Sequence, residues 1–256
     1  YTLASSSPAS QPKNRLLDCT LRDGGYINNW MFSDDFVAAF MQVVTSIVDI
    51  VEVGFVNSPE AYRSCPVGKY RNLCRDDLKK LKQEASHCSL AVMVDLNAIN
   101  REVLIPRNKS VDVVRIAFSK ADVSRAKMLA GELLECGYEV CLNFMSSHLY
   151  TPRELAAHSA EVGASIPYVV DSLGCMSAKE IARYIELLPA TAGLHLHNNL
   201  QQAVGVYSAV ECGIIDATIF GMGRGAGNLP LELCDIPFDA RAKLVSFYHS
   251  HMSNIP

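Results

Sequence analysis

The chain has 256 residues, of which 49% are hydrophobic and 20% charged, a composition typical of a globular protein with a large buried core. The formal net charge is −4 and the lysines and arginines are scattered, which argues against a nucleic-acid partner. No apolar run approaches the roughly 18 residues of a membrane span, so we expect no membrane contact. Nine cysteines without a CxxC pair favour reduced thiols in a cytoplasmic compartment.

Residues 1–15 are rich in Ser, Ala and Pro and contain no acidic residue. Because they also show no periodicity, we interpret them as a disordered tail. An organellar transit segment is the alternative, although only Lys13 and Arg15 are basic in this stretch. Residues 16–256 are expected to form a single catalytic domain.

From residue 16 onward, short apolar runs alternate with longer amphipathic stretches. The predicted strands are 16–21, 50–55, 90–94, 113–118, 139–144, 168–171, 193–197 and 217–220. The predicted helices are 33–46, 75–85, 121–136, 152–162, 178–188 and 201–212, with a last one opening at Pro230. Near-continuous apolar strands are typical of a parallel sheet covered by helices. Eight such units predict an α/β fold, a closed (βα)8 TIM barrel. The alternative is an open doubly wound sheet, but the sequence lacks the Gly-rich phosphate turn that usually follows the first strand of such a sheet.

Polar side chains fall within, at or just after the carboxyl-terminal parts of these strands. In a barrel such groups converge on one face, where catalytic residues lie. The candidates are Asp23, Glu52, Arg115, Asn143, Asp171, His195, His197 and Asn228. Their number predicts a functional site at this face.

His195 and His197 are two residues apart on a predicted strand, so both imidazoles point to the same side. A carboxylate from Asp23 would complete a set of two histidines and one carboxylate, which leaves open coordination positions for substrate. Such a set suits Mn²⁺ or Mg²⁺, with Zn²⁺ or Fe²⁺ compatible by ligand type. Histidines packed in the core are the structural alternative.

Arg22 precedes Asp23, and the period of two sends its side chain in another direction unless Gly24 and Gly25 bend the chain. Its guanidinium is suited to hold an enolate or carboxylate oxygen, with a surface ion pair as the alternative. Glu52 is a catalytic candidate at the barrel mouth. Its alternative is a buried ion pair with Arg22 or Arg115, which would orient Arg22.

Five segments carry a family resemblance: 18–26, 52–54, 171–174, 195–199 and 221–228. Together they resemble the TIM-barrel metallolyases that include HMG-CoA lyase, isopropylmalate synthase and 4-hydroxy-2-oxovalerate aldolase. The resemblance extends from Leu16 to about Ile236. The loop 223–232 lacks the cysteine of HMG-CoA lyases, which favours the aldolase branch.

The resemblance implies that Asp23, His195 and His197 bind the metal, with Asn228 near it. It also implies that Arg22 stabilises an enolate. Ser172, Arg115 and Arg224 complete the expected substrate-binding set. The implied activity is cleavage or formation of a 4-hydroxy-2-oxo acid through a pyruvate enolate, with a 2-oxo acid and an aldehyde as the small-molecule partners.

The sequence departs from the aldolase pattern at three places. Tyr26 stands where the aldolase has a histidine base, and a phenol with an unperturbed pKa of roughly 10 serves as a base only if that pKa is depressed. Arg224 replaces a small residue and would bind a second carboxylate or phosphate, or is solvated. The chain stops at Pro256, so we expect neither the C-terminal helical region of the aldolases nor docking to an aldehyde dehydrogenase.

Two other functions stay open. A Claisen-type acyl-CoA lyase or synthase would share the metal site, and a non-catalytic barrel would serve as a binding or scaffold protein. The long loop 57–72 is expected to cover or select substrate. A homo-oligomer, by default a dimer, is the expected assembly.

Overall fold

The computed structural model describes residues 14–62, 64, 66–85 and 87–252. Eight parallel strands form a closed barrel in which each strand pairs with the next along the chain and the last pairs with the first. The strands are β1 (Arg15–Asp18), β2 (Ile50–Phe55), β3 (Ser89–Asp95), β4 (Val113–Phe118), β5 (Glu139–Phe144), β6 (Ile166–Asp171), β7 (Gly193–Leu196) and β8 (Ile214–Ala217). The predicted (βα)8 barrel is therefore confirmed.

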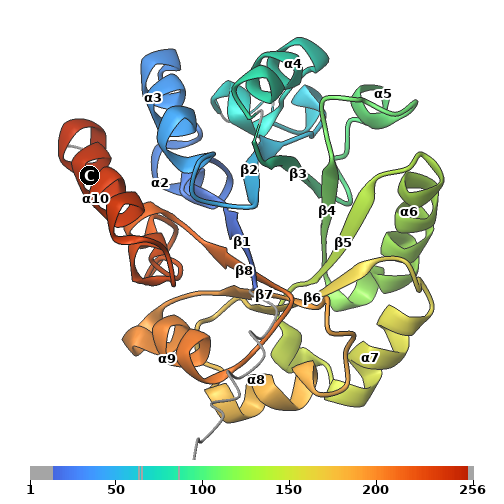
Figure 1. Cartoon of the computed structure of the whole chain (residues 1–256). Coiled ribbons are helices and arrows are strands. Elements are labelled where there is room, and N and C mark those ends of the chain that lie inside the picture. The colour runs from blue at the N-terminus through green and yellow to red at the C-terminus, as the bar shows by residue number, and fades with distance from the viewer. Residues whose placement is uncertain (1–13, 63, 65, 86, 253–256) are drawn as a thin grey trace, which may run out of the picture.

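Helices surround the barrel (Figure 1). They are α1 (Thr20–Asp23), α2 (Gly25–Asn28), α3 (Asp34–Val44), α4 (Arg75–Glu84), α5 (Arg101–Leu104), α6 (Val123–Glu135), α7 (Pro152–Ala160), α8 (Ala178–Ile185), α9 (Gln202–Ala209) and α10 (Phe238–Phe247). The hydroxyls of Ser33, Thr151 and Ser177 accept hydrogen bonds from the first turns of α3, α7 and α8. Such caps satisfy amide groups that have no partner within the helix, which fixes where these helices begin.

The apolar core has two parts. A large cluster lies between the strands and the helices, and a smaller one fills the barrel interior around Leu17, Ile50 and Tyr168. Each fully buried Leu or Ile side chain contributes about 1.5–3 kcal/mol relative to an exposed one. The closed, filled interior leaves the strand ends as the place for a site.

Several predicted boundaries are wrong, including the ends of the first and last strands and the start of the last helix. β1 ends at Asp18 instead of residue 21, because Thr20–Asp23 forms a helical turn. β8 begins at Ile214 and ends at Ala217, three residues earlier than predicted, because the buried Asp216 finds partners inside the barrel. Pro230 precedes only the short 3₁₀ helix Leu231–Leu233, and the last α-helix begins at Phe238.

Other expectations concern the chain as a whole. Of the predicted tail, residues 1–13 lie outside the described residues, whereas Arg15 is the first residue of β1. The eight cysteines that the structure describes are free. No helix in the described ranges has the length and apolar character needed to cross a membrane.

Candidate metal centre and active site

Asp23, His195 and His197 come together at the carboxyl-terminal end of the barrel. Each offers a ligand atom, and these atoms lie within 4.8 Å of one another. Asp23 is the last residue of α1, His195 lies in β7, and His197 follows β7 directly. All three side chains are buried, with at most 5% of their surface exposed. The predicted ligand set is thus assembled from segments far apart in the sequence.

Hydrogen bonds fix which nitrogen of each histidine faces the cluster. His195 Nδ1 lies 2.8 Å from Asp216 Oδ2, and His197 Nδ1 lies 3.2 Å from the Gly227 carbonyl. A carboxylate and a carbonyl only accept, so each Nδ1 carries the proton and donates. Both Nε2 atoms therefore keep a lone pair for a cation, the arrangement usual for metal-binding histidines.

Both carboxylate oxygens of Asp23 are held in place. Arg22 Nη1 donates to Oδ1 and Asn228 Nδ2 donates to Oδ2, each at 2.6 Å. Burial alone would raise the pKa of Asp23, but the Arg22 guanidinium, the two histidines and Asn228 outweigh it and lower the pKa to about 2. Burial, followed by the neighbouring His195, lowers the pKa of His197 to about 4. At neutral pH the cluster has the anionic carboxylate and neutral imidazole that a metal ligand set requires.

The amide of Asn228 adds a further oxygen. Its Nδ2 donates to Asp23 and to the Met222 carbonyl at 3.1 Å. Its Oδ1 is buried with no hydrogen-bond partner among the described residues. Two imidazole nitrogens, a carboxylate and an orphaned amide oxygen fit a divalent cation, and the oxygen donors suit Mn²⁺ or Mg²⁺.

The loop after β8 reaches the cluster because of two glycines. A Cβ on Gly223 would lie 2.3 Å from Asn228 Nδ2 and 3.0 Å from Asp23 Oδ2, so only glycine fits there. Gly227 has φ of 76°, a left-handed conformation that glycine adopts readily, and its carbonyl faces His197. The glycine-rich segment therefore serves to close the site.

A second group, formed by Cys19, His195 and Asp216, also has metal-ligand geometry. Burial raises the pKa of the Cys19 thiol well above its ordinary value, and a thiol must lose its proton to bind a metal. Asp216 is already engaged by Arg115 at 2.5 Å and by His195. These constraints favour Asp23, His195 and His197 as the ligand set.

Two arginines and two carboxylates form a buried network beneath the cluster. Glu52 Oε2 accepts from Arg22 Nε at 2.7 Å and from Arg115 Nη1 at 2.8 Å. Arg115 also donates to Asp216, and its guanidinium carbon lies 4.4 Å from the centroid of the Tyr168 ring. Glu52 thus forms the ion pairs that the sequence left as an alternative to a catalytic role.

Arg115 does not fit the predicted role of substrate binding. Its side chain is 0% exposed, and its hydrogen bonds go to protein groups below the cavity. Its charge balances Glu52 and Asp216, which in turn hold Arg22 and His195. Arg115 is therefore a positioning residue, and Arg22 is the guanidinium that reaches the cavity.

Arg22 and Asp23 point toward each other, contrary to the argument from strand periodicity. That argument fails because both residues lie in the helical turn of α1. Arg22 Nη1 and Nε are used by Asp23 and Glu52, whereas Nη2 is buried without a partner among the described residues. One guanidinium nitrogen is left to bind a substrate oxygen.

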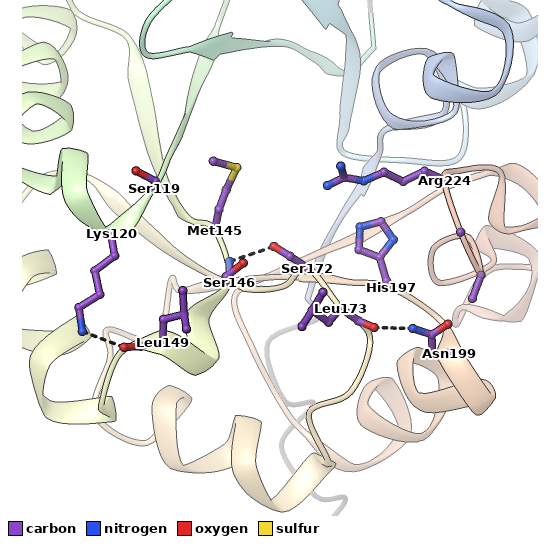
Figure 2. A pocket seen from close by; sticks show the side chains of 12 residues that line it. Ser119, Lys120, Met145, Ser146, Leu149, Ser172, Leu173, His197, Asn199 and Arg224 are labelled. Atoms are coloured by element: carbon purple, nitrogen blue, oxygen red, sulfur yellow. Dashed lines mark hydrogen bonds between the residues drawn. The ribbon is translucent and has the colours of Figure 1, made fainter.

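Two connected cavities open above the ligands. The inner one, about 50 Å³, is lined by residues that include Arg22, Asp23, Tyr26, His195 and His197. The outer one, about 560 Å³, shares Met145, Ser172, His197 and Arg224 with it (Figure 2). Ser172 Oγ accepts from the Ser146 amide at 2.9 Å, which leaves its proton free to donate. Tyr26, Ser172 and Arg224 thus lie where a substrate would contact them.

None of the described residues of the loop 57–72 lines the inner or the outer cavity, and the loop contacts the wall of the inner cavity through Asp95. Arg71, in the 3₁₀ helix Lys69–Arg71, donates to Asp95 Oδ2 at 2.7 Å. Its guanidinium carbon lies 3.8 Å from the Phe55 ring centroid and 4.5 Å from that of Trp30. Asp95, at the end of β3, lines the inner cavity with a side chain that is 32% exposed. Residues 63 and 65 of this loop lie outside the described residues.

The sequence missed Asp216 and Asp95. Asp216 was overlooked because the last strand was placed three residues too late, although an acidic residue inside the run Ile-Ile-Asp-Ala marks a buried carboxylate with partners. Asp95 follows the apolar run 90–94 directly and belongs to the same strand. Its position at a strand end was the available signal.

A closed (βα)8 barrel with two histidines and a carboxylate at its strand ends is the arrangement of metal-dependent barrel enzymes. The chain belongs to the HMGL-like family, whose model matches residues 13–241. The similarity to 4-hydroxy-2-oxovalerate aldolases and to an oxaloacetate decarboxylase confirms the resemblance drawn from the sequence motifs and supports a lyase of the aldolase type.

A 4-hydroxy-2-oxovalerate aldolase of Pelotomaculum thermopropionicum is 32% identical over 243 residues, covering 87% of this chain and 69% of the relative. An oxaloacetate decarboxylase of Mycobacterium tuberculosis is 28% identical over 253 residues, covering 90% and 71%. The chain thus spans about two thirds of the length of these curated relatives.

Solved structures agree. The N-terminal domain of a proposed aldolase from Bacteroides vulgatus superposes with a TM-score of 0.81 at 30% identity, covering 92% of this chain and 86% of that one. A carboxyl transferase domain of Rhizobium etli pyruvate carboxylase gives a TM-score of 0.73 at 14% identity, covering 94% and 47%, and shares the fold.

Proposed function

We propose that this protein is a divalent-metal-dependent aldolase that cleaves or forms a 4-hydroxy-2-oxo acid through a pyruvate enolate. The observation that carries the proposal is the unpaired Nη2 of Arg22 in the cavity that holds Asp23, His195 and His197. A fixed cation beside a metal ligand set stabilises negative charge that develops on a carbonyl oxygen. The aldolase relatives support the same reaction class.

Asp23, His195 and His197 would hold the cation, with the Asn228 amide oxygen beside them. When bound, a divalent cation supplies Lewis-acid polarisation of the 2-oxo group. Arg22 holds the oxygen that becomes the enolate, and its position is fixed by Glu52. The hydroxyl of Ser172 donates to the substrate carboxylate. In the cleavage direction a base takes the proton of the 4-hydroxyl, the C3–C4 bond breaks, the aldehyde leaves, and the enolate is protonated at C3.

Tyr26 and Asp95 are the two candidates for that base, since both line the inner cavity outside the ligand set. The Tyr26 ring packs against Trp30 with centroids 4.6 Å apart, and the Arg224 guanidinium carbon lies 5.0 Å from its centroid. Asp95 Oδ2 accepts from Asn57, Tyr62 and Arg71. These donors fix the Asp95 carboxylate at the wall of the inner cavity.

Decarboxylation of oxaloacetate is a second candidate reaction, favoured by the Mycobacterium tuberculosis relative. Loss of the 4-carboxylate as carbon dioxide leaves the same pyruvate enolate, so Arg22 would play the same part. Both reactions break the C3–C4 bond; they differ in the leaving group, which is carbon dioxide in one and, after the 4-hydroxyl loses its proton, an aldehyde in the other.

The test is release of pyruvate, followed with lactate dehydrogenase, from 4-hydroxy-2-oxovalerate and from oxaloacetate with and without Mn²⁺. We expect Mn²⁺-dependent turnover that His197→Ala abolishes without unfolding the protein. Turnover of acyl-CoA substrates alone would instead place the protein among the Claisen-type enzymes. Failure to bind Mn²⁺ or Mg²⁺ at all would argue for a non-catalytic barrel.

A further inference from the structure

The charged side chains that line the outer cavity are all positive among the described residues. Among the described residues that line it are two cations, Lys120 and Arg224, and no carboxylate. Lys120 is balanced, because its Nζ lies 2.8 Å from Glu154 Oε1 and 2.7 Å from the Leu149 carbonyl (Figure 2). The uncompensated positive charge of this cavity therefore comes from Arg224.

Arg224 extends from the loop after β8 over the ring of His197 toward the middle of the cavity (Figure 2). It lines both the outer and the inner cavity, so its charge lies at their junction. Within the part of the chain that the structure describes, no carboxylate lies at salt-bridge distance from its guanidinium. A guanidinium with five donors and no anionic partner is suited to bind a carboxylate or phosphate of a ligand.

The rest of the outer cavity can hold the body of such a ligand. Ser119 and Ser146 contribute polar groups, and Leu149 and Leu173 contribute apolar surface. A volume of about 560 Å³ exceeds the need of pyruvate alone. The second product of cleavage therefore has its own space next to Arg224.

We propose that the substrate carries a second anionic group, a carboxylate or phosphate, at the end remote from the 2-oxo acid, and that Arg224 binds this group. That the other end of the substrate is a 2-oxo acid rests on the proposed function. Cleavage of the C3–C4 bond then leaves pyruvate and an aldehyde that keeps the anionic group. Arg224 is a specificity-determining residue for that aldehyde.

Binding of two unreactive 2-oxo acids tests the anion site without turnover. 2-Oxoglutarate and 2-oxovalerate have the same chain length and differ in a terminal carboxylate or methyl group, and neither has a 4-hydroxyl to deprotonate. In titration calorimetry with Mn²⁺-loaded protein, we expect 2-oxoglutarate to bind about tenfold tighter or more, as a charge-assisted hydrogen bond allows. Arg224→Met should remove this preference and leave 2-oxovalerate binding unchanged.

Arg183→Met is the matched control, because Arg183 is an exposed arginine on α8 that lines neither cavity. It should keep the wild-type preference. Equal binding of the two acids by the wild type, or a preference that survives Arg224→Met, would overturn the anion site.

Aldol addition of pyruvate to three aldehydes distinguishes the anionic groups. Glyoxylate carries a carboxylate, glyceraldehyde 3-phosphate a phosphate, and acetaldehyde no charge. Arg224→Met should lower kcat/KM for the preferred anionic aldehyde about tenfold or more relative to that for acetaldehyde. If no aldehyde reacts but the binding preference depends on Arg224, the aldolase proposal fails and the anion site stands. If acetaldehyde reacts at least as fast as both anionic aldehydes, the aldolase stands and the anion site is refuted.

Discussion

Replacing Asp216 with asparagine tests how the metal site is held from below. Asp216 Oδ2 accepts from His195 Nδ1 at 2.8 Å and from Arg115 Nη2 at 2.5 Å. Asparagine keeps the shape but removes the charge that fixes the His195 tautomer. Loss of a carboxylate behind a metal-binding histidine lowers metal affinity by roughly 10- to 100-fold, or about 1.4 to 2.7 kcal/mol.

Asp216→Asn should leave the protein folded. Arg115 keeps Glu52 Oε2 at 2.8 Å and Asn143 Oδ1 at 3.1 Å, so its buried charge retains partners. The free energy of unfolding should therefore fall by about 2 kcal/mol, less than the roughly 3–5 kcal/mol for stranding one member of a buried ion pair. Urea unfolding of the metal-free protein, followed by circular dichroism, measures this loss in the free energy of unfolding separately from metal binding.

Mn²⁺ titration of Asp216→Asn, Asp23→Asn and Asp49→Asn completes the test. Asp49→Asn is the control, because this exposed carboxylate makes the same change in charge and accepts from the Leu16 amide near the start of β1. We expect wild-type affinity for the control, a weakened site for Asp216→Asn and loss of binding for Asp23→Asn. Equal affinities of the Asp216 and Asp49 variants would refute the reasoning. Loss in Asp216→Asn with retention in Asp23→Asn would place the cation on Cys19, His195 and Asp216.

Three further predictions concern the residues around the ligands. Arg22→Lys should keep Mn²⁺ affinity within about tenfold but lower kcat at least roughly 100-fold, near 3 kcal/mol, because an oxyanion donor is lost; an unchanged kcat would exclude Arg22 from the chemistry. If Asp95 is the base, Asp95→Asn should lower kcat more than Tyr26→Phe does, whereas the reverse order would assign the base to Tyr26. Burial raises the pKa of Asp18 to about 7 against hydrogen bonds from Thr20, so the folded state holds its proton between pH 4 and 7 while the unfolded state loses it. Stability from this group therefore falls as pH rises through that window. The free energy of unfolding of Asp18→Asn, measured with urea, should exceed that of the wild type at pH 8 by up to about 4 kcal/mol and converge with it near pH 4.

Hydrophobic patterning was sufficient to predict the barrel, but it did not predict where every strand begins and ends. The runs that became β2, β4 and β5 were placed to the residue, because each is six residues long and keeps apolar residues on both sides of a polar one such as Glu52 or Arg115, whereas β8 has only four residues. β8 was misplaced because its Asp216 resembles a break in such a run. Only the tertiary partners Arg115 and His195 explain a carboxylate at that position.

The sequence was sufficient to predict which residues form the ligand cluster, but not which contacts hold them in place. His195 in β7 and His197 just after it offer ligand atoms to the same cluster, as their spacing of two residues predicted. The contact between Arg22 and Asp23 depends on a helical turn that the sequence read as strand. Arg71 was expected only as part of the long loop 57–72; its position among the rings of Phe55 and Trp30 was not predicted, since it is set by the path of that loop.

Closure of the barrel by β1 and β8 makes cation binding a measure of folding. Asp23 follows the first strand, whereas His195 and its partner Asp216 come from the last two. No half of the chain contains the full ligand set, so the cation site forms only when the ends of the sheet meet. A cation that binds only this state stabilises it by mass action. The rate at which Mn²⁺ binding is recovered during refolding should therefore equal the rate at which the first and last strands pair.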